Sequence, residues 1–272
     1  PTAAFPFQPQ PASNAQCPFP VIANGTLRFL IDHVRLFHAI AFCLAAVPLL
    51  ATRPTMARFT ENRGQWPGQV AFRALVPGGA LYVEQRAFTY ILHTGGPLAK
   101  HGHAHTGPSQ PVHAHAFRVH FEGAASALPQ GGNAAAHYEN FYLGNNPAKW
   151  GTRCGVFGEI SMTALYPGID LRVDGRHGLK YDFEVAAGAD PTAIRMRFEG
   201  QTDLRVKEGR LVVHTTAGTV TEEAPVAWQE TPAGRKAVRC SFLLEGDCVR
   251  FELPEGHDPA LPLVIDPVLS FG

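Results

Sequence analysis

The sequence is poor in charge and lacks the short motifs that mark common enzymes. Only 17% of its 272 residues are charged, and 23 Lys and Arg balance 23 Asp and Glu. Bulk charge therefore directs the chain neither to nucleic acid nor to an anionic membrane. The chain has no Gly-x-Ser-x-Gly elbow, no His-Glu-x-x-His pair and no Gly-x-x-x-x-Gly-Lys phosphate loop. A hydrolase, a zinc protease or a nucleotide-binding enzyme of those types is not indicated.

Glycine and proline are, by contrast, abundant, with 27 Gly and 23 Pro. They divide the chain beyond Phe59 into short segments of alternating apolar residues, with no amphipathic helix between them. The segments 70–76 and 80–92 flank Pro-Gly-Gly as a hairpin, and the only helix expected is short, at 191–194. This pattern predicts an all-β protein of antiparallel, β-sandwich-like sheets with little helix, in one large domain or two closely packed lobes.

The N-terminal part has the features of a processing signal. The apolar run at 36–51 follows Arg35 and ends in small residues, which is typical of a secretory signal peptide. It is shorter than the roughly 20 residues that a bilayer span needs. We expect residues 34–57 to be a cleaved signal peptide and residues 1–33 to be an upstream segment outside the native protein. The mature protein is then secreted, extracellular or at the cell surface, with no membrane span.

The remaining chain is divided by two stretches of low complexity. Residues 58–122 are expected to form an N-terminal β lobe with a His-rich loop at 93–115. The Gly-, Ala- and Pro-rich stretch 123–136 is predicted to be a linker, and residues 137–272 a C-terminal β lobe.

Three cysteines fall in the expected mature chain, Cys154, Cys240 and Cys248, and an odd number does not indicate a disulfide framework. A two-residue turn after Glu245 pairs that residue with Cys248 and places Cys240 on the opposite side of the pleat. We expect no bond between Cys240 and Cys248, and buried free thiols instead.

The histidines form the most distinctive non-structural feature of the sequence, which holds 13 of them. Imidazoles at i and i+2 lie on one side of an extended chain, where several can converge on Zn²⁺ or another transition metal. The candidate ligands are His101, His103, His105, His113 and His115. The alternatives are weak adventitious binding and a simple solvated loop, because the Gly and Pro of the tract make ordering costly.

Four acidic residues lie close together in sequence and form a second candidate site. Asp170, Asp174, Asp182 and Glu184 fall on one expected hairpin, where they suit a Ca²⁺ site or an acid/base pair. Their ordinary role is the solvated face of a strand. No catalytic residue and no resident cofactor is assigned.

Five motifs stand in an order that resembles a known family. They are FTENRGQW (59–66), NFYLGNNPAKW (140–150), YPGIDLRV (166–173), KYDFEVAAGADPTAIRMRFEG (180–200) and PLVIDPVLSFG (262–272). Together they resemble the bacterial extracellular domain of unknown function that precedes SBBP-repeat β-propellers. Within them, Asp190 is expected to cap the short helix, and Trp66, Tyr142 and Trp150 to pack in the core or between lobes.

The resemblance implies location and context rather than catalysis. It implies a non-enzymatic extracellular module with a structural, adhesive or capping role, truncated here before the propeller repeats. Its expected partners are those downstream repeats and a cell-surface protein or glycan, not nucleic acid. The alternatives are a His-rich metal-binding protein of the periplasm or surface, and a metal- or glycan-processing enzyme.

Overall fold

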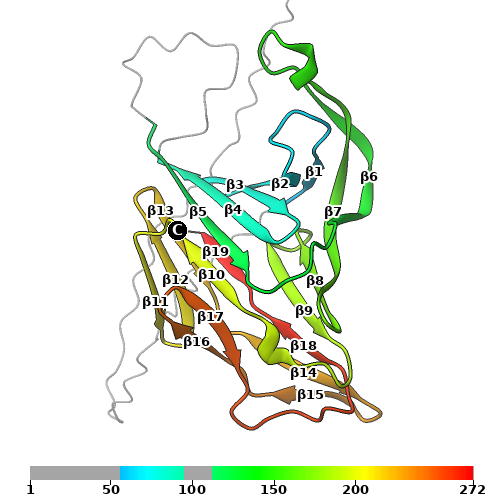
Figure 1. Cartoon of the computed structure of the whole chain (residues 1–272), viewed down its shortest axis with the longest axis vertical. Coiled ribbons are helices and arrows are strands. Elements are labelled where there is room, and N and C mark those ends of the chain that lie inside the picture. The colour runs from blue at the N-terminus through cyan, green and yellow to red at the C-terminus, as the bar shows by residue number, and fades with distance from the viewer. Residues whose placement is uncertain (1–55, 95–111, 272) are drawn as a thin grey trace, which may run out of the picture. The chain divides into compact units, whose positions relative to one another are not determined.

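A computed structural model of the chain describes residues 56–94 and 112–271 (Figure 1). Strands dominate both ranges, and the only helices there are the short 3₁₀ turns η1 (Pro147–Lys149) and η2 (Pro191–Ala193). The predicted all-β class with antiparallel sheets is confirmed. No helix in these two ranges has the length and hydropathy that a bilayer crossing requires. The expected signal peptide lies almost wholly outside the described residues.

Most strands belong to one large sheet. They are β1 (Phe59–Glu61), β2 (Val70–Val76), β3 (Gly79–Glu84), β4 (Ala87–His93), β5 (Ala114–Phe121), β6 (Gln130–Phe141), β7 (Gly151–Tyr166), β8 (Ile169–Asp174), β9 (Lys180–Val185), β10 (Met196–Glu199), β14 (Val226–Thr231), β15 (Gly234–Val238), β16 (Ser241–Glu245), β17 (Cys248–Glu252) and β18 (Leu263–Asp266). The small sheet contains β11 (Asp203–Lys207), β12 (Arg210–Thr215), β13 (Gly218–Glu222) and β19 (Leu269–Phe271).

The large sheet has 15 strands in the order β15-β14-β18-β9-β8-β7-β1-β2-β3-β4-β5-β10-β17-β16, with β6 paired to β7. The small sheet has the order β11-β12-β13-β19. Every pairing between these strands is antiparallel, as short turns between neighbouring strands allow.

One segment expected to be a single strand is two. Residues 80–92 contain both β3 and β4, and the chain reverses at Gln85 and Arg86. No Gly or Pro marks this turn, although the alternation changes phase across it, from Leu81 and Val83 to Phe88 and Tyr90. The turn brings Arg86 to a surface groove.

Alternation along the strands separates the core from the surface. In β5, Phe117, Val119 and Phe121 are buried, whereas Arg118 and His120 point to the opposite side. The buried aromatic rings meet in stacked and edge-to-face pairs, such as Tyr90 with Phe117 at 4.7 Å between centroids. The outward face of β5 is therefore free to carry polar side chains.

The small sheet packs its apolar face against the same core. Leu211, Val213 and Val220 are buried there, and they join the cluster that contains the core residues of the large sheet. The last strand contributes as well, since Phe271 lies 6.5 Å from Tyr90 between ring centroids. Burial of this apolar area, at about 25 cal/mol per Å², is the main source of stability.

The predicted linker and the division into two lobes do not match the strand pairing. Residues 130–136 lie in β6 rather than in a linker. Strands of both expected lobes pair within one sheet, β1 with β7 and β5 with β10, and all the described strands belong to one compact unit. The low complexity of this stretch has a packing cause, because a Cβ at Gly131 would overlap the ring of Phe157 and one at Gly132 the side chain of Glu159.

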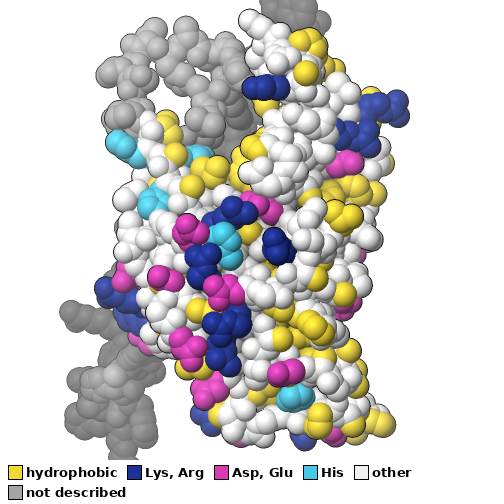
Figure 2. Space-filling model, viewed as in Figure 1, with side chains coloured by type: hydrophobic (Ala, Val, Ile, Leu, Met, Phe, Trp, Pro, Cys, Tyr) yellow, Lys and Arg dark blue, Asp and Glu magenta, His cyan; other side chains and the backbone are white. Residues whose placement is uncertain are grey.

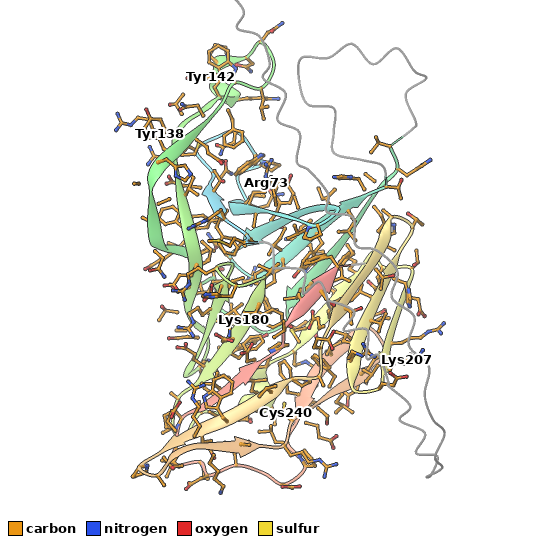
Figure 3. The ribbon with its side chains drawn as sticks, turned by 180° about the vertical axis from the view of Figure 1, so that it is seen from behind. Arg73, Tyr138, Tyr142, Lys180, Lys207 and Cys240 are labelled. Carbon is orange, nitrogen blue, oxygen red and sulfur yellow. The ribbon has the colours of Figure 1, made fainter. Side chains whose placement is uncertain are left out.

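Strands β6 and β7 extend from the sheet as a two-stranded arm that ends at η1 (Figures 1 and 3). The arm carries exposed aromatic residues, since Tyr138 and Tyr142 are 54% and 61% exposed. The prediction that Tyr142 packs in the core or between lobes is therefore wrong. Tyr142 instead meets Trp150 edge-on, and the Trp150 indole donates a hydrogen bond to the Gly144 carbonyl.

Two local predictions are confirmed in detail. Glu245 pairs with Cys248, and Cys154, Cys240 and Cys248 are all free thiols. The side chain of Asp190 accepts a 2.9 Å hydrogen bond from the Thr192 amide and caps η2. Both features depend on residues close in sequence.

Candidate ligand-binding groove

The histidine tract is described only at its ends. His101, His103 and His105 lie outside the described residues, whereas His113 and His115 lie within them. His115 Nδ1 is 2.9 Å from Thr216 Oγ1, and its Nε2 is 2.6 Å from the Gly200 carbonyl oxygen. Both ring nitrogens of His115 thus connect β5 to loops beside the small sheet, so the ring is not free to ligate a metal in this conformation.

Metal binding by the complete tract stays a prediction. Across residues 56–94 and 112–271, no three His, Cys, Asp or Glu side chains are grouped as a metal site. His113 is exposed and has no side-chain hydrogen bond in these ranges.

The four acidic residues of the second candidate site are held by separate partners. Asp170 accepts a 2.7 Å hydrogen bond from the Ala164 amide. Asp174 accepts hydrogen bonds from Arg176, which keep the pKa of this carboxyl below its usual value. The two groups are therefore not poised to act together on a ligand.

The other two acids belong to a network of cations. Asp182 is almost fully buried and accepts hydrogen bonds from Arg172 at 3.0 Å and from Lys180 at 3.1 Å. Glu184 lies 3.4 Å from Arg172. Lys180 also bonds Asp266 at 2.8 Å. Burial lowers the pKa of Lys180, but its bonds to Asp266 and Asp182 outweigh that effect and raise it above its usual value. This arrangement stabilises the sheet and leaves no open carboxylate pair.

A groove lies instead on the outer face of β3, β4, β5 and β10. It consists of two depressions that share Gln69, Glu84 and Arg118. The polar depression has a volume of about 510 Å³, and its further lining residues include Gln85, Arg86, His120, Glu122, Ser126 and Arg197. The aromatic depression has a volume of about 340 Å³ and is lined further by Trp66, Pro67, Val70, Tyr82, Thr89 and Ile91. Figure 2 shows charged side chains of both signs gathered over β4, β5 and β10.

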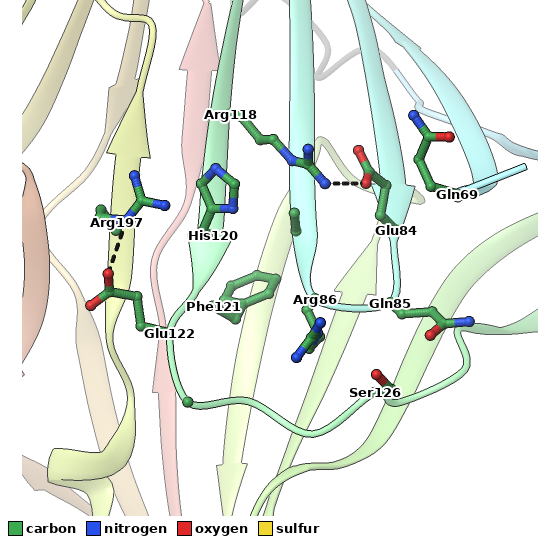
Figure 4. Close-up of a pocket in the computed structure, with 12 residues that line it drawn as sticks. Gln69, Glu84, Gln85, Arg86, Arg118, His120, Phe121, Glu122, Ser126 and Arg197 are labelled. Carbon is green, nitrogen blue, oxygen red and sulfur yellow. Dashed lines mark hydrogen bonds and ion pairs between the residues drawn. The ribbon is translucent and has the colours of Figure 1, made fainter. Parts of the chain in front are cut away.

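Glu84 is the fixed centre of the groove. Only 7% of its side chain is exposed, and its two oxygens accept hydrogen bonds from Thr89 Oγ1 and Arg118 Nη2. Figure 4 shows the pair of Glu84 with Arg118. Glu84 lies on β3, Thr89 on β4 and Arg118 on β5, and Thr89 and Arg118 are directly opposite each other in the sheet. Two neighbouring strands thus hold the carboxylate of a third. With both oxygens engaged, Glu84 is suited to positioning Arg118 rather than to accepting a proton from a substrate.

The far side of the polar depression is built from further ion pairs. Arg197 Nε donates a 2.9 Å hydrogen bond to Glu122, and His120 Nε2 lies 2.8 Å from Glu199. The hydrogen bond and charge of His120 keep the pKa of the Glu199 carboxyl below its usual value. These pairs join β5 to β10 and fix the floor of the depression.

Arg86 differs from the other cations of the groove. It is exposed at the turn between β3 and β4, and its guanidinium has no ion pair or hydrogen bond in the part of the chain that the structure describes. Figure 4 shows Arg86 near Gln85 and Ser126 at one end of the polar depression. Gln85 and Ser126 likewise make no side-chain hydrogen bond within the described ranges. One positive charge and several hydrogen-bonding groups are thus available to a ligand.

The aromatic depression has a rigid wall. Trp66 meets Tyr82 edge-on at 6.2 Å and Phe141 at 5.2 Å between ring centroids. The Arg73 guanidinium lies over the Trp66 ring at 4.9 Å. Contacts on several sides hold the indole in place beside the depression that it lines.

Sequence reasoning found one side of this groove but not the groove itself. Along residues 115–123, apolar side chains alternate with Arg118, His120 and Glu122, and this alternation predicts that the three polar residues lie on the solvated face of a strand. It did not indicate that Glu84 and Arg86 lie beside them, because the turn at 85–86 was missed. Trp66 is predicted to pack in the core or between lobes, but it is half-buried and lines the groove.

The fold defines an all-β protein made of antiparallel sheets, with a groove on the outer face of the large one. The model of a family described as a domain of unknown function, DUF7948, matches residues 59–268. The chain belongs to this family. No curated protein and no solved structure matches the chain.

Proposed function

We propose that the chain is a non-enzymatic extracellular β module with a structural or adhesive role. In this proposal it stands on the N-terminal side of an SBBP-repeat propeller, caps the first repeat and presents a sheet face for binding. The proposal unites the resemblance of the five motifs, the expected signal peptide at 34–57 and the architecture of antiparallel sheets.

The observation that supports a capping role most directly is the position of β19. This strand pairs through one edge with β13 and lies at the end of the small sheet. Leu269 is buried and Phe271 packs against the core, so the strand is firmly held. The start of its other edge is occupied, because the Leu269 amide donates a hydrogen bond to the Leu179 carbonyl. The backbone groups at Phe271 are left on this edge, and a following repeat is suited to pair with them.

The groove supports a binding role rather than a chemical one. Its carboxylates are engaged by neighbouring cations, Glu84 by Arg118 and Glu122 by Arg197. A general base needs a lone pair directed at the substrate, whereas these carboxylates orient arginines.

Capping is tested by comparing this chain with the same chain extended at its C-terminus by one SBBP repeat. We expect the extended protein to melt at a higher temperature and to aggregate less at equal concentration. Equal melting temperatures and equal solubility would contradict the capping role. A repeat with a proline in its first strand is the control, because proline removes a backbone donor needed for strand pairing.

A further inference from the structure

The groove combines an aromatic wall with hydrogen-bonding groups and one uncompensated cation. Trp66 and Tyr82 line the aromatic depression, and Gln69, Glu84 and Arg118 belong to both depressions. Arg86 stands in the polar depression without an ion pair among the described residues. The two depressions are therefore continuous in their lining but different in their chemistry.

The charges of the groove determine the sign of its ligand. Arg118 is neutralised by Glu84, and Arg197 lies within 2.9 Å of Glu122. Arg195 shares Glu122 at 3.5 Å, and His120 faces Glu199. Arg86 is left, and an exposed guanidinium with free donors is suited to a carboxylate, which it binds through two parallel hydrogen bonds.

The uncharged groups determine the rest of the ligand. Gln69, Gln85 and Ser126 supply both donors and acceptors, which match a molecule rich in hydroxyl groups. The rings of Trp66 and Tyr82 supply an apolar surface beside them, which suits the C–H face of a sugar ring. A flat peptide or a lipid chain matches this mixture less well, because the polar side chains of Glu84 and Arg118 border the aromatic depression.

We propose that this groove binds an oligosaccharide that contains an acidic sugar. A sugar ring lies against Trp66 and Tyr82, and the carboxylate of the same or the next sugar pairs with Arg86. Arg118, oriented by Glu84, donates hydrogen bonds at the junction of the two depressions. This inference rests on the proposed adhesive role and names the ligand of that role.

The test is calorimetric titration of the full chain with short oligomers of galacturonate, of mannuronate and guluronate, and of glucuronate with N-acetylglucosamine. Each oligomer is paired with its neutral methyl ester. We expect at least one acidic oligomer to bind, and its methyl ester to bind at least about tenfold more weakly. Inorganic phosphate is titrated as a competitor, and we expect it not to displace the oligomer at equal concentration.

Two variants locate the binding. Arg86→Gln changes an exposed side chain with no partner among the described residues, so folding is retained, and we expect at least about tenfold weaker binding of the acidic oligomer with no change for the ester. Trp66→Ala is expected to weaken the binding of the acidic oligomer and of its methyl ester. Trp228 is the matched control, because it is also half-buried and lies under an arginine, Arg235, at 4.7 Å. Trp228→Ala is expected to leave binding unchanged.

Several outcomes would overturn the inference. They are a lack of binding by all three classes of oligomer, equal binding of acid and ester, full displacement by phosphate, and unchanged binding in Arg86→Gln. None of them affects the repeat-extension experiment, so the capping role is judged separately from the ligand.

Discussion

Tyr181 donates a 2.6 Å hydrogen bond to Glu222 and so joins the two sheets through their shared core. Tyr181 belongs to β9 of the large sheet and Glu222 to β13 of the small one, and both side chains are almost fully buried. Burial raises the pKa of Glu222 to about 7, although the bond from Tyr181 opposes this shift. The nearby Tyr90 hydroxyl is also buried, and its pKa is raised well above the usual value.

The raised pKa makes stability depend on pH in a defined window. Below the unfolded pKa of about 4.5, Glu222 is protonated in both the folded and the unfolded protein, and the stability that comes from burying the neutral carboxyl is fully present. As the pH rises through about 7, the folded protein must also ionise this carboxyl, and that contribution is lost. Glu222→Gln removes the ionisation, so we expect the variant to exceed the parent in stability by about 3 kcal/mol at pH 8.

Urea denaturation between pH 4.5 and 8.5 measures this effect. The neighbouring Glu223→Gln, which is only half-buried, is the control and is expected to follow the parent. Parallel stability curves for Glu222→Gln and the parent would show that Glu222 ionises normally in the folded protein.

Lys180 is expected to be the most sensitive charged residue on the β8–β9–β18 face. It bonds Asp182 and Asp266, so Lys180→Met leaves two neighbouring carboxylates without their common cation. We expect a loss of about 3 kcal/mol in the free energy of unfolding, since removal of one partner from a buried pair is costly. Lys236→Met, on the exposed strand β15, is expected to change it by less than about 0.5 kcal/mol.

A second substitution checks the cause of that loss. Lys180→Met combined with Asp266→Asn is expected to recover part of the stability, because one repelling charge is removed. If the double variant is no better than the single one, lost packing of the lysine stem explains the effect instead.

Gly79 is required by the close approach of β3 and β4. A Cβ at this position would overlap the carbonyl oxygen of Ile91, whereas a Cβ at Gly68 would meet no atom within 4 Å. We expect Gly79→Ala to lower the free energy of unfolding by about 3 kcal/mol and Gly68→Ala to change it by less than about 0.5 kcal/mol. Thermal melts of the two variants measure the difference, and equal melts would contradict the overlap.

Asp190 stabilises the start of η2 through its side-chain oxygens. It accepts hydrogen bonds from the amide and the hydroxyl of Thr192, so we expect Asp190→Ala to cost about 1 kcal/mol. Asp190→Asn retains an acceptor and is expected to keep most of this stability. Chemical denaturation of both variants is the measurement, and an equal loss in the two would assign the effect to charge rather than to capping.

The features that the sequence predicted correctly depend on neighbouring residues. The cap at Asp190 and the pairing of Glu245 with Cys248 each follow from a local turn. Each is determined within about ten residues, where backbone geometry alone decides the outcome.

The features that it missed depend on pairing between distant strands. Glu84 and Arg118 are brought together by the register of β3, β4 and β5, and a long segment between β4 and β5 leaves that register unspecified in the sequence. The Gly-rich start of β6 was interpreted as a linker, because the ring of Phe157 that requires Gly131 comes from another strand. Strand register is set by such cross-strand contacts rather than by local composition.

Strand β7 is one continuous strand whose two halves have different numbers of neighbours. In the described part of the chain, its beginning from Gly151 to Gly155 pairs only with β6, whereas the stretch from Phe157 to Ser161 pairs with β6 and also with β1 or β8. A two-stranded ribbon protects its amides poorly. Amide hydrogens should therefore exchange with deuterium more rapidly between Gly151 and Gly155 than between Phe157 and Ser161.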